Sequence, residues 1–364
     1  MKRLSRCNKQ RLIRLAKIRA NHKSSRIKKK VLIGYILNGT GFAKKKRSSY
    51  VTVKIVAPIS FNLYQAARRQ NLIVFIDEIK RAIKANASIR IDFSHVKRLN
   101  PCGTILFIAE LMRIIELKGN KQRVTCTLPK DKIVEQLFKH VGILDLLGCR
   151  SNVVVQHETV KHWTLCKGDL VDLSGLKSLK DKLDIELGEE RSFALFTGIQ
   201  EAITNTVHHA YIEERGDGFD ASSKKWFLFA KHMEGQVSLA ICDLGIGIRR
   251  SLPRKMPWPK QIFDETLEKL GANTDLDAKH IKAAIMLGAT RTGLSNRGKG
   301  LHDMKHVASL CENGRLDILS NKGVYRFSKK INSEIILDHK SNIQGTIVQW
   351  GFNTSDYLGS ENAD

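Results

Sequence analysis

The apolar residues between positions 51 and 147 change repeatedly from strand-like to helix-like spacing. Strand-like spacing predicts strands at 51–58, 89–93 and 124–128. Spacings of three and four residues predict helices at 71–85, 104–117 and 131–147, and Asp131 is expected to cap the last of them. Regular alternation of strands and helices is typical of α/β folds, so we expect a sheet covered by helices.

Positive charge is concentrated in the first part of the chain. Residues 1–76 contain 20 Lys and Arg and no Asp or Glu, whereas the remainder contains 42 basic and 36 acidic residues. The net charge of +26 therefore lies mainly in a basic N-terminal arm, residues 1–49. Such charge attracts phosphate groups, so residues 1–47 are a candidate nucleic-acid-binding segment, with an acidic protein or anionic lipid as alternative partners. A solvated tail and a transit peptide also fit this composition.

Two further features bear on the class of protein and its compartment. No apolar run approaches the about 20 residues that a membrane span requires, so we expect none. The seven cysteines contain no C-x-x-C pair, which does not fit a disulfide framework or a zinc site. We therefore expect a cytoplasmic protein.

The segment 50–155 carries two motifs, one at its second predicted strand and one before the following helix. They read Ile91-Asp92-Phe93-Ser94-His95-Val96 and Leu99-Asn100-Pro101-Cys102-Gly103. This segment resembles the STAS domain, the small α/β module of bacterial anti-sigma factor antagonists. In regulated members of that family the turn before the helix carries a phosphorylatable serine, whereas Pro101 and Cys102 stand here. A buried structural role for Cys102 is favoured over a reactive thiol at a helix start.

The segment 191–211 has two chemically different faces at helical spacing. One face is apolar and contains Phe196, Ile199, Ile203, Val207 and Ala210. The other face is polar and contains Glu201, Asn205, His208 and His209. We expect the apolar face to pack on a sheet. The polar face is either solvated or part of a ligand site, and this segment alone does not separate the two.

Two later segments favour the ligand site. The apolar strand 237–242 runs into Asp243-Leu244-Gly245-Ile246-Gly247-Ile248, where the glycines would let the backbone approach a ligand. Further along, Asn296-Arg297-Gly298-Lys299-Gly300-Leu301 opens a predicted helix. A helix N-terminus presents unpaired N–H groups and a positive dipole end to phosphate.

In this order the three motifs resemble those of the GHKL ATPases, which include DNA gyrase, heat-shock chaperones, mismatch-repair ATPases and histidine kinases. The most similar branch is the anti-sigma factor serine kinases, through Glu201-Ala202-Ile203-Thr204-Asn205 and His209-Ala210-Tyr211. The resemblance covers residues 189–352 and implies an α/β sandwich, a mixed and largely antiparallel sheet with helices on one face. We accordingly expect a linker at 156–188 and a tail at 353–364. A long lid is expected at 249–296, as a conformational gate or a plain insertion.

The resemblance also implies roles for residues of the first motif. Asn205 would hold Mg²⁺ through its amide oxygen, since magnesium prefers hard oxygen ligands. Glu201 would be the general base that polarises a water or a protein hydroxyl. His209 would contact the bound cofactor or pack within the motif.

The other two motifs would hold the two ends of ATP. Asp243 would accept a hydrogen bond from the adenine amino group, with Thr346 beside it and space left by Gly245 and Gly247. The phosphates would be bound by the backbone and side chains of Arg297, Gly298, Lys299, Gly300 and Leu301.

These features predict an ATP- and Mg²⁺-binding regulatory protein of bacterial type, in which the nucleotide controls binding to a protein partner. Whether Glu201 serves ATP hydrolysis or protein serine phosphorylation is left open. One alternative is a nucleic-acid-associated protein that binds through residues 1–47 and has a regulatory or inactive ATP site. Another is a scaffold that binds ATP without turnover, and a homodimer is compatible with each.

Overall fold

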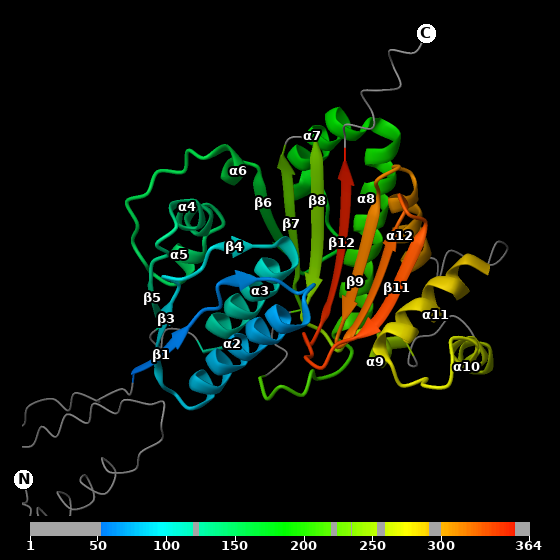
Figure 1. Cartoon of the computed structure of the whole chain (residues 1–364), viewed down its shortest axis with the longest axis horizontal. Helices are drawn as coiled ribbons and strands as arrows, with labels where there is room; N and C mark the ends of the chain where they lie inside the picture. The colour runs from blue at the N-terminus through cyan, green and yellow to red at the C-terminus, as the bar shows by residue number, and fades with distance from the viewer. Residues whose placement is uncertain are drawn as a thin grey trace, which may run out of the picture.

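The computed structural model describes residues 52–118, 124–219, 224–233, 235–252, 259–290 and 300–353. Over this part the chain has the mixed α/β architecture that the sequence predicts (Figure 1). The basic arm, residues 1–49, lies outside the described residues, as does the expected tail from residue 354 onward. No described helix combines the length and apolar character that crossing a bilayer requires.

The first unit, residues 52–161, is built around a parallel sheet in the order β1-β3-β5. Its strands are β1 (Thr52–Val56), β3 (Ser88–Asp92) and β5 (Val124–Thr127), beside a small pair formed by β2 (Ser60–Phe61) and β4 (Arg98–Leu99). Its helices are α2 (Ala66–Lys84), α3 (Pro101–Lys118), α4 (Lys132–His140), α5 (Ile143–Leu146) and α6 (Glu158–Lys161). Buried phenylalanine rings fill its centre, and Phe107 lies 5.1 Å from Phe61 and 5.9 Å from Phe93 between centroids.

The single helix predicted at 131–147 is two helices. Asp131 caps α4 as expected, because its Oδ1 accepts hydrogen bonds from the amides of Ile133 and Val134 at 2.9 and 3.2 Å. Gly142 then adopts a φ of +78°, in the left-handed region, and breaks the helix before α5. Glycine enters this region at little cost, so it commonly ends a helix.

The second unit contains a seven-stranded sheet in the order β11-β10-β9-β12-β8-β7-β6. Its strands are β6 (Trp163–Gly168), β7 (Trp226–Met233), β8 (Gln236–Asp243), β9 (Arg315–Ser320), β10 (Gly323–Ser328), β11 (Ser333–Asp338) and β12 (Thr346–Asn353). Every neighbouring pair among these strands is antiparallel, so the expectation of a mixed sheet is wrong. The helical segments are η2 (Ser174–Leu176), α7 (Lys177–Leu187), α8 (Glu189–Asn205), η3 (Thr206–Ala210), α9 (Ile248–Ser251), α10 (Lys260–Lys269), α11 (Asp277–Thr290) and α12 (Gly300–Ser309).

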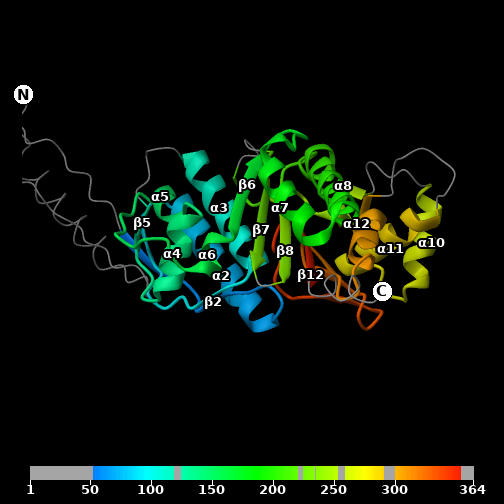
Figure 2. The ribbon, with the colours of Figure 1, turned by 90° about the horizontal axis from the view of Figure 1, so that it is seen from above.

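Helices cover both faces of this sheet, whereas the resemblance implied helices on one face only. Trp226 and Leu228 of β7 are buried in a cluster with residues of α7, α8 and α12. Phe227 and Phe229 point the other way and join the core of the first unit, where α3 packs on β7 and β8. Figure 2 shows the sheet between the first unit and α8 and α12. Continuous apolar strands such as β7 are typical of sheets buried on both faces.

The segment 156–188, predicted to be a linker, is part of both units. It contains α6, and β6 forms the edge of the seven-stranded sheet by pairing with β7. Trp163 anchors β6, because its ring lies 4.5 Å from that of Phe229. Helix α7 then packs on α8 through Leu179, Leu183 and Leu187. The helical spacing of these leucines is readable in the sequence, whereas the partly buried edge strand β6 has little alternation to detect.

Charged side chains are buried where the two units meet. Glu110 of α3 accepts from Lys80 of α2 at 2.7 Å and is paired with Arg215 of the segment between η3 and β7. Arg113 of α3 is paired with Asp217 at 2.5 Å. Burial alone would raise the pKa of Glu110, but Arg215 and Lys80 hold it below its ordinary value. The carboxylate is therefore charged, and its cationic partners compensate its removal from water.

Replacing Glu110 by alanine tests this charge cluster. The change removes the nearest carboxylate of two buried cations and leaves Lys80 and Arg215 only their longer ion pairs with Asp217, at 3.9 and 3.6 Å, so we expect a loss of about 3 kcal/mol in the free energy of unfolding. Glu116 is the matched control, because it also links α3 to the second unit, through an exposed pair with Lys225. Glu116→Ala should cost less than about 1 kcal/mol. Denaturant titration measures both, and equal losses would contradict a structural role for the cluster.

Candidate functional site

Helix α8 and the π-helical turn η3 carry the polar residues of the first predicted motif. Ile199 and Ile203 are fully buried against the sheet, as the apolar spacing predicted. The register changes after Asn205, where Thr206 Oγ1 donates to the carbonyl of Ala202 at 3.0 Å. Such π-turns are frequent at functional sites because they redirect the side chains that follow. Here the turn ends at Ala210, whose carbonyl accepts the amide of Ile246 at 2.9 Å.

The start of α12 lies directly against Glu201 and Asn205. A Cβ placed on Gly300, the first residue of α12, would lie 2.7 Å from Glu201 Oε2 and 3.2 Å from Asn205 Nδ2. Glu201 is half-buried, and burial together with nearby Asp303 raises the pKa of its carboxyl group above the ordinary value. A helix N-terminus, a carboxyl group and an amide therefore meet at one place.

Asp243 ends β8 in a buried, hydrogen-bonded position. Its Oδ1 accepts the amides of Gly245 at 2.8 Å and Thr346 at 3.3 Å, and Asp243 and Thr346 are register partners in β8 and β12. Burial raises the pKa of Asp243 to about 6, although the hydrogen bonds from Gly245 and Thr346 and the charge of Arg215 act to lower it. The carboxyl group is thus ionised at neutral pH in a largely dehydrated setting.

Two glycines after Asp243 allow close backbone packing, and we call residues 243–247 the glycine loop. A Cβ on Gly245 would overlap the carbonyl of Ala210 in η3. Gly247 has a φ of +80°, and a Cβ there would overlap the side-chain amide of Asn321. The loop is therefore fitted against η3 on one side and against the β9–β10 turn on the other.

The structure brings most of the predicted site residues together. Glu201, Asn205, Gly300 and Leu301 lie along α8 and α12, which pack on each other, and η3 connects this end to the glycine loop and Thr346. His209 is half-buried within η3, with its ring perpendicular to that of His208. Arg297, Gly298 and Lys299 lie outside the described residues.

The sequence interpretation assigned no role to two residues that support the glycine loop. The hydroxyl of Tyr211 accepts the amide of Leu244 at 3.0 Å and donates to the carbonyl of Lys225 at 2.6 Å. Asn321 donates through Nδ2 to the carbonyl of Ile246 at 3.0 Å. Asn321 has a φ of +53° within Ser320-Asn321-Lys322-Gly323, and this turn-type sequence was the available signal.

The described residues contain no group of three or more His, Cys, Asp or Glu side chains placed to hold a metal ion. A magnesium ion bound with nucleotide takes one or two protein ligands and fills its shell with phosphate oxygens and water. The side-chain amide of Asn205, half-buried beside the start of α12, is of the chemical type that this arrangement needs.

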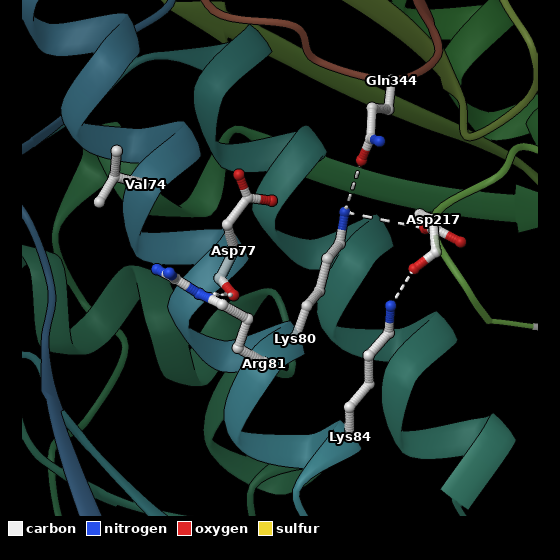
Figure 3. A pocket seen from close by; sticks show the side chains of 7 residues that line it. All are labelled: Val74, Asp77, Lys80, Arg81, Lys84, Asp217 and Gln344. Carbon is white, nitrogen blue, oxygen red and sulfur yellow. Dashed lines mark hydrogen bonds and ion pairs between the residues drawn. The ribbon is translucent and has the colours of Figure 1, made fainter. Parts of the chain in front are cut away.

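A separate pocket lies at the boundary between the two units (Figure 3). It has a volume of about 420 Å³ and is lined by Val74, Asp77, Lys80, Arg81, Lys84, Asp217 and Gln344. Lys80 and Lys84 reach across it from α2 towards Asp217, and Lys80 also donates to Gln344 at 3.2 Å. None of the predicted site residues lines this pocket, and Lys80 and Asp217 in its wall belong to the charge cluster between the units.

Comparisons with known proteins do not place this chain in a family, since no family model, no curated protein and no solved structure matches it.

Replacing Gly245 by alanine tests the packing of the glycine loop on η3. The added methyl group must displace the carbonyl of Ala210 or the loop itself, so we expect a loss of about 1–3 kcal/mol in the free energy of unfolding. Gly175→Ala is the control, because a Cβ at Gly175 has no heavy atom within 4 Å among the described neighbours. Thermal and denaturant unfolding measure both variants. If the two were equally stable, the close approach of the loop to η3 would be wrong.

Proposed function

We propose that the second unit binds ATP with Mg²⁺ and that the nucleotide regulates binding to a protein partner. The observation that carries this proposal is the position of Gly300, where the start of α12 lies against Glu201 and Asn205. A helix N-terminus favours phosphate, and the side-chain amide of Asn205 beside it carries an oxygen of the kind that magnesium binds. The proposed identity as a GHKL-type ATPase, nearest to the anti-sigma factor serine kinases, and that of the first unit as a STAS-like domain, rest on the sequence motifs.

The glycine loop would receive the adenine base. Both backbone amides that reach Asp243 bind its Oδ1, so Oδ2 is the atom we assign to the adenine amino group. That role requires the ionised carboxylate, which accepts but does not donate. The expectation that Gly245 and Gly247 leave space for the ring is wrong, because Ala210 and Asn321 pack directly against them, so these glycines fix the course of the loop beside Asp243.

The chemical step is assigned to Glu201. When bound, Mg²⁺ would supply charge neutralisation at the phosphates, and Asn205 would hold it. Glu201 would accept the proton of the attacking water or protein hydroxyl, and its raised pKa brings its basicity closer to neutrality than that of an ordinary glutamate. The same carboxylate could accept the proton from either water or a protein hydroxyl. Hydrolysis and serine phosphorylation are therefore alternatives within this proposal.

Variants of α8 test these roles separately. Asn205→Ala should remove the magnesium dependence of ATP affinity, because the proposed ligand is lost. Glu201→Gln should bind ATP normally and lose on the order of 10²–10⁴-fold in phosphate release or phosphotransfer, since a general base contributes about that factor. Calorimetry with and without Mg²⁺, and γ-labelled ATP, provide the measurements.

Gln200→Ala is the matched control for these variants, because Gln200 is exposed on the same helix. It should behave as the wild type does. Unchanged magnesium dependence in Asn205→Ala would contradict the role of Asn205 as a magnesium ligand. Unchanged turnover in Glu201→Gln would contradict the role of Glu201 as the general base. ATP binding by the wild type without release or transfer of label would identify a scaffold that binds nucleotide without turnover.

A second function is favoured by the charge of the arm. Its Lys and Arg residues are uncompensated, since the first acidic residue of the chain is Asp77. We expect the full chain to bind DNA or RNA with an affinity that falls steeply as salt rises, because counterions are released from the nucleic acid. Deleting residues 1–47 should abolish this binding and leave ATP affinity unchanged. Retention that is independent of salt, or that survives the deletion, would exclude the arm as the binding segment.

A further inference from the structure

Arg69 of α2 is fully buried and reaches from the first unit into the loops of the second. Its Nη2 donates to the carbonyls of Asn321 at 2.8 Å and Ser341 at 3.3 Å. Its Nε and Nη1 have no hydrogen-bond partner among the described residues. Burial lowers the pKa of Arg69 to about 10, and nearby Asp338 acts in the opposite direction. The guanidinium therefore remains charged at neutral pH. Burying a charge is unfavourable unless hydrogen bonds or an ion pair compensate it, so the contacts of Arg69 are expected to matter for the structure.

Asn321, the residue that Arg69 contacts, joins three segments of the proposed nucleotide site. Its amide donates to the carbonyl of Gly345, the residue before Thr346, at 3.0 Å. Its carbonyl accepts the amide of Ile343 at 3.0 Å as well as the guanidinium. Its side chain donates to the carbonyl of Ile246, between the two glycines of the glycine loop. Asn321 is thus bonded to the frame around Asp243 through its backbone amide, its carbonyl and its side-chain nitrogen.

The bond from Arg69 is one of the contacts that hold Asn321 in its turn conformation. A φ of +53° costs a non-glycine residue free energy, and surrounding contacts must hold it. Two hydrogen bonds converge on its carbonyl, and the one from Arg69 is the charge-assisted and hence stronger one. Loss of that bond would let the turn relax and withdraw the side-chain amide from Ile246.

We propose that Arg69 is a positioning residue for the base-binding loop and that nucleotide binding in turn stabilises docking of the first unit on the sheet. This inference rests on the proposed function, because the glycine loop is taken as the adenine site. Coupling free energies are reciprocal. If Arg69 stabilises the loop conformation that binds nucleotide, then bound nucleotide stabilises the contact made by Arg69. The first unit would thereby sense the nucleotide state without touching the nucleotide.

The experiment compares Arg69→Met and Arg69→Lys with Tyr64→Phe in the full chain. Tyr64→Phe is the matched control, because the hydroxyl of Tyr64 also crosses between the units, donating to Gln349 of β12 at 2.6 Å, but does not contact the glycine loop or Asn321. Arg69→Met should weaken ATP affinity by about tenfold, within the usual range of coupling between sites. Arg69→Lys should recover part of the loss, since lysine keeps the charge without the planar donor geometry. Tyr64→Phe should stay within about twofold of the wild type, because it leaves the coupled element untouched.

Hydrogen exchange separates this inference from the proposed function. In the wild type, ATP should slow exchange in α2 as well as in the glycine loop, and in Arg69→Met the effect on α2 should disappear. Without nucleotide, the glycine loop should exchange faster in Arg69→Met than in Tyr64→Phe, even if the wild type binds no ATP and the proposed function fails. Equal loop exchange in these two variants, or wild-type ATP affinity in Arg69→Met, would overturn the positioning role. If Arg69→Met does not fold, the same comparisons are made with Arg69→Lys.

Discussion

Burial of both faces of the antiparallel sheet is the constraint on which the rest of the structure depends. Strands β7 and β8 are apolar on both sides, so the sheet cannot leave either face in water. Helices α7, α8 and α12 cover one face, and α3 of the first unit packs on the other. The first unit is therefore a structural layer of the second, and its core and one face of the sheet form a single apolar cluster. The two units therefore share one apolar core, and the segment 156–188 between them contributes strand β6 to the sheet.

The charges at the boundary of this apolar contact make the docking specific. An apolar contact alone would allow the first unit to dock on the sheet in several orientations. Buried charges restrict this choice, because the ion pairs Arg113–Asp217 and Arg215–Glu110 form in the observed orientation. Each of these pairs joins α3 to the segment between η3 and β7. That segment also contains Tyr211, which holds the glycine loop at Leu244. Correct docking and correct loop placement are thus determined by neighbouring residues of the same segment.

Sequence periodicity was sufficient for elements whose apolar pattern is set by burial on one side. The buried positions of α8, the cap at Asp131 and the pairing of Asp243 with a glycine-rich turn could all be read in the sequence, and the structure has them. The α/β class is confirmed for the same reason. The assignment of the two units to the STAS and GHKL families stays a prediction.

Features that depend on contacts distant in sequence could not be read in the same way. Edge strand β6 shows little alternation because four of its six residues are only partly buried. Nothing local predicts that α3 covers the second face of the sheet, since an apolar helix fits either its own unit or a neighbour. Arg69 resembles Arg68 in sequence, yet it is fully buried because of bonds to residues about 250 positions away. Long-range partners of this kind leave no periodic signal.

The position of Cys102 bears on how a STAS-like first unit could be regulated. Its side chain is fully buried at the start of α3, and its thiol donates to Gln349 Oε1 at 2.5 Å on the face of β12 that the first unit covers. Burial raises the pKa of Cys102 to about 12, so the thiol stays protonated. Glu201 lies on α8, which covers the opposite face, so the sheet separates the two residues. A phosphoryl group from the proposed site could not reach position 102 of the same docked chain. Regulation within one chain would therefore act through the loops at the sheet edge and not through modification at the start of α3.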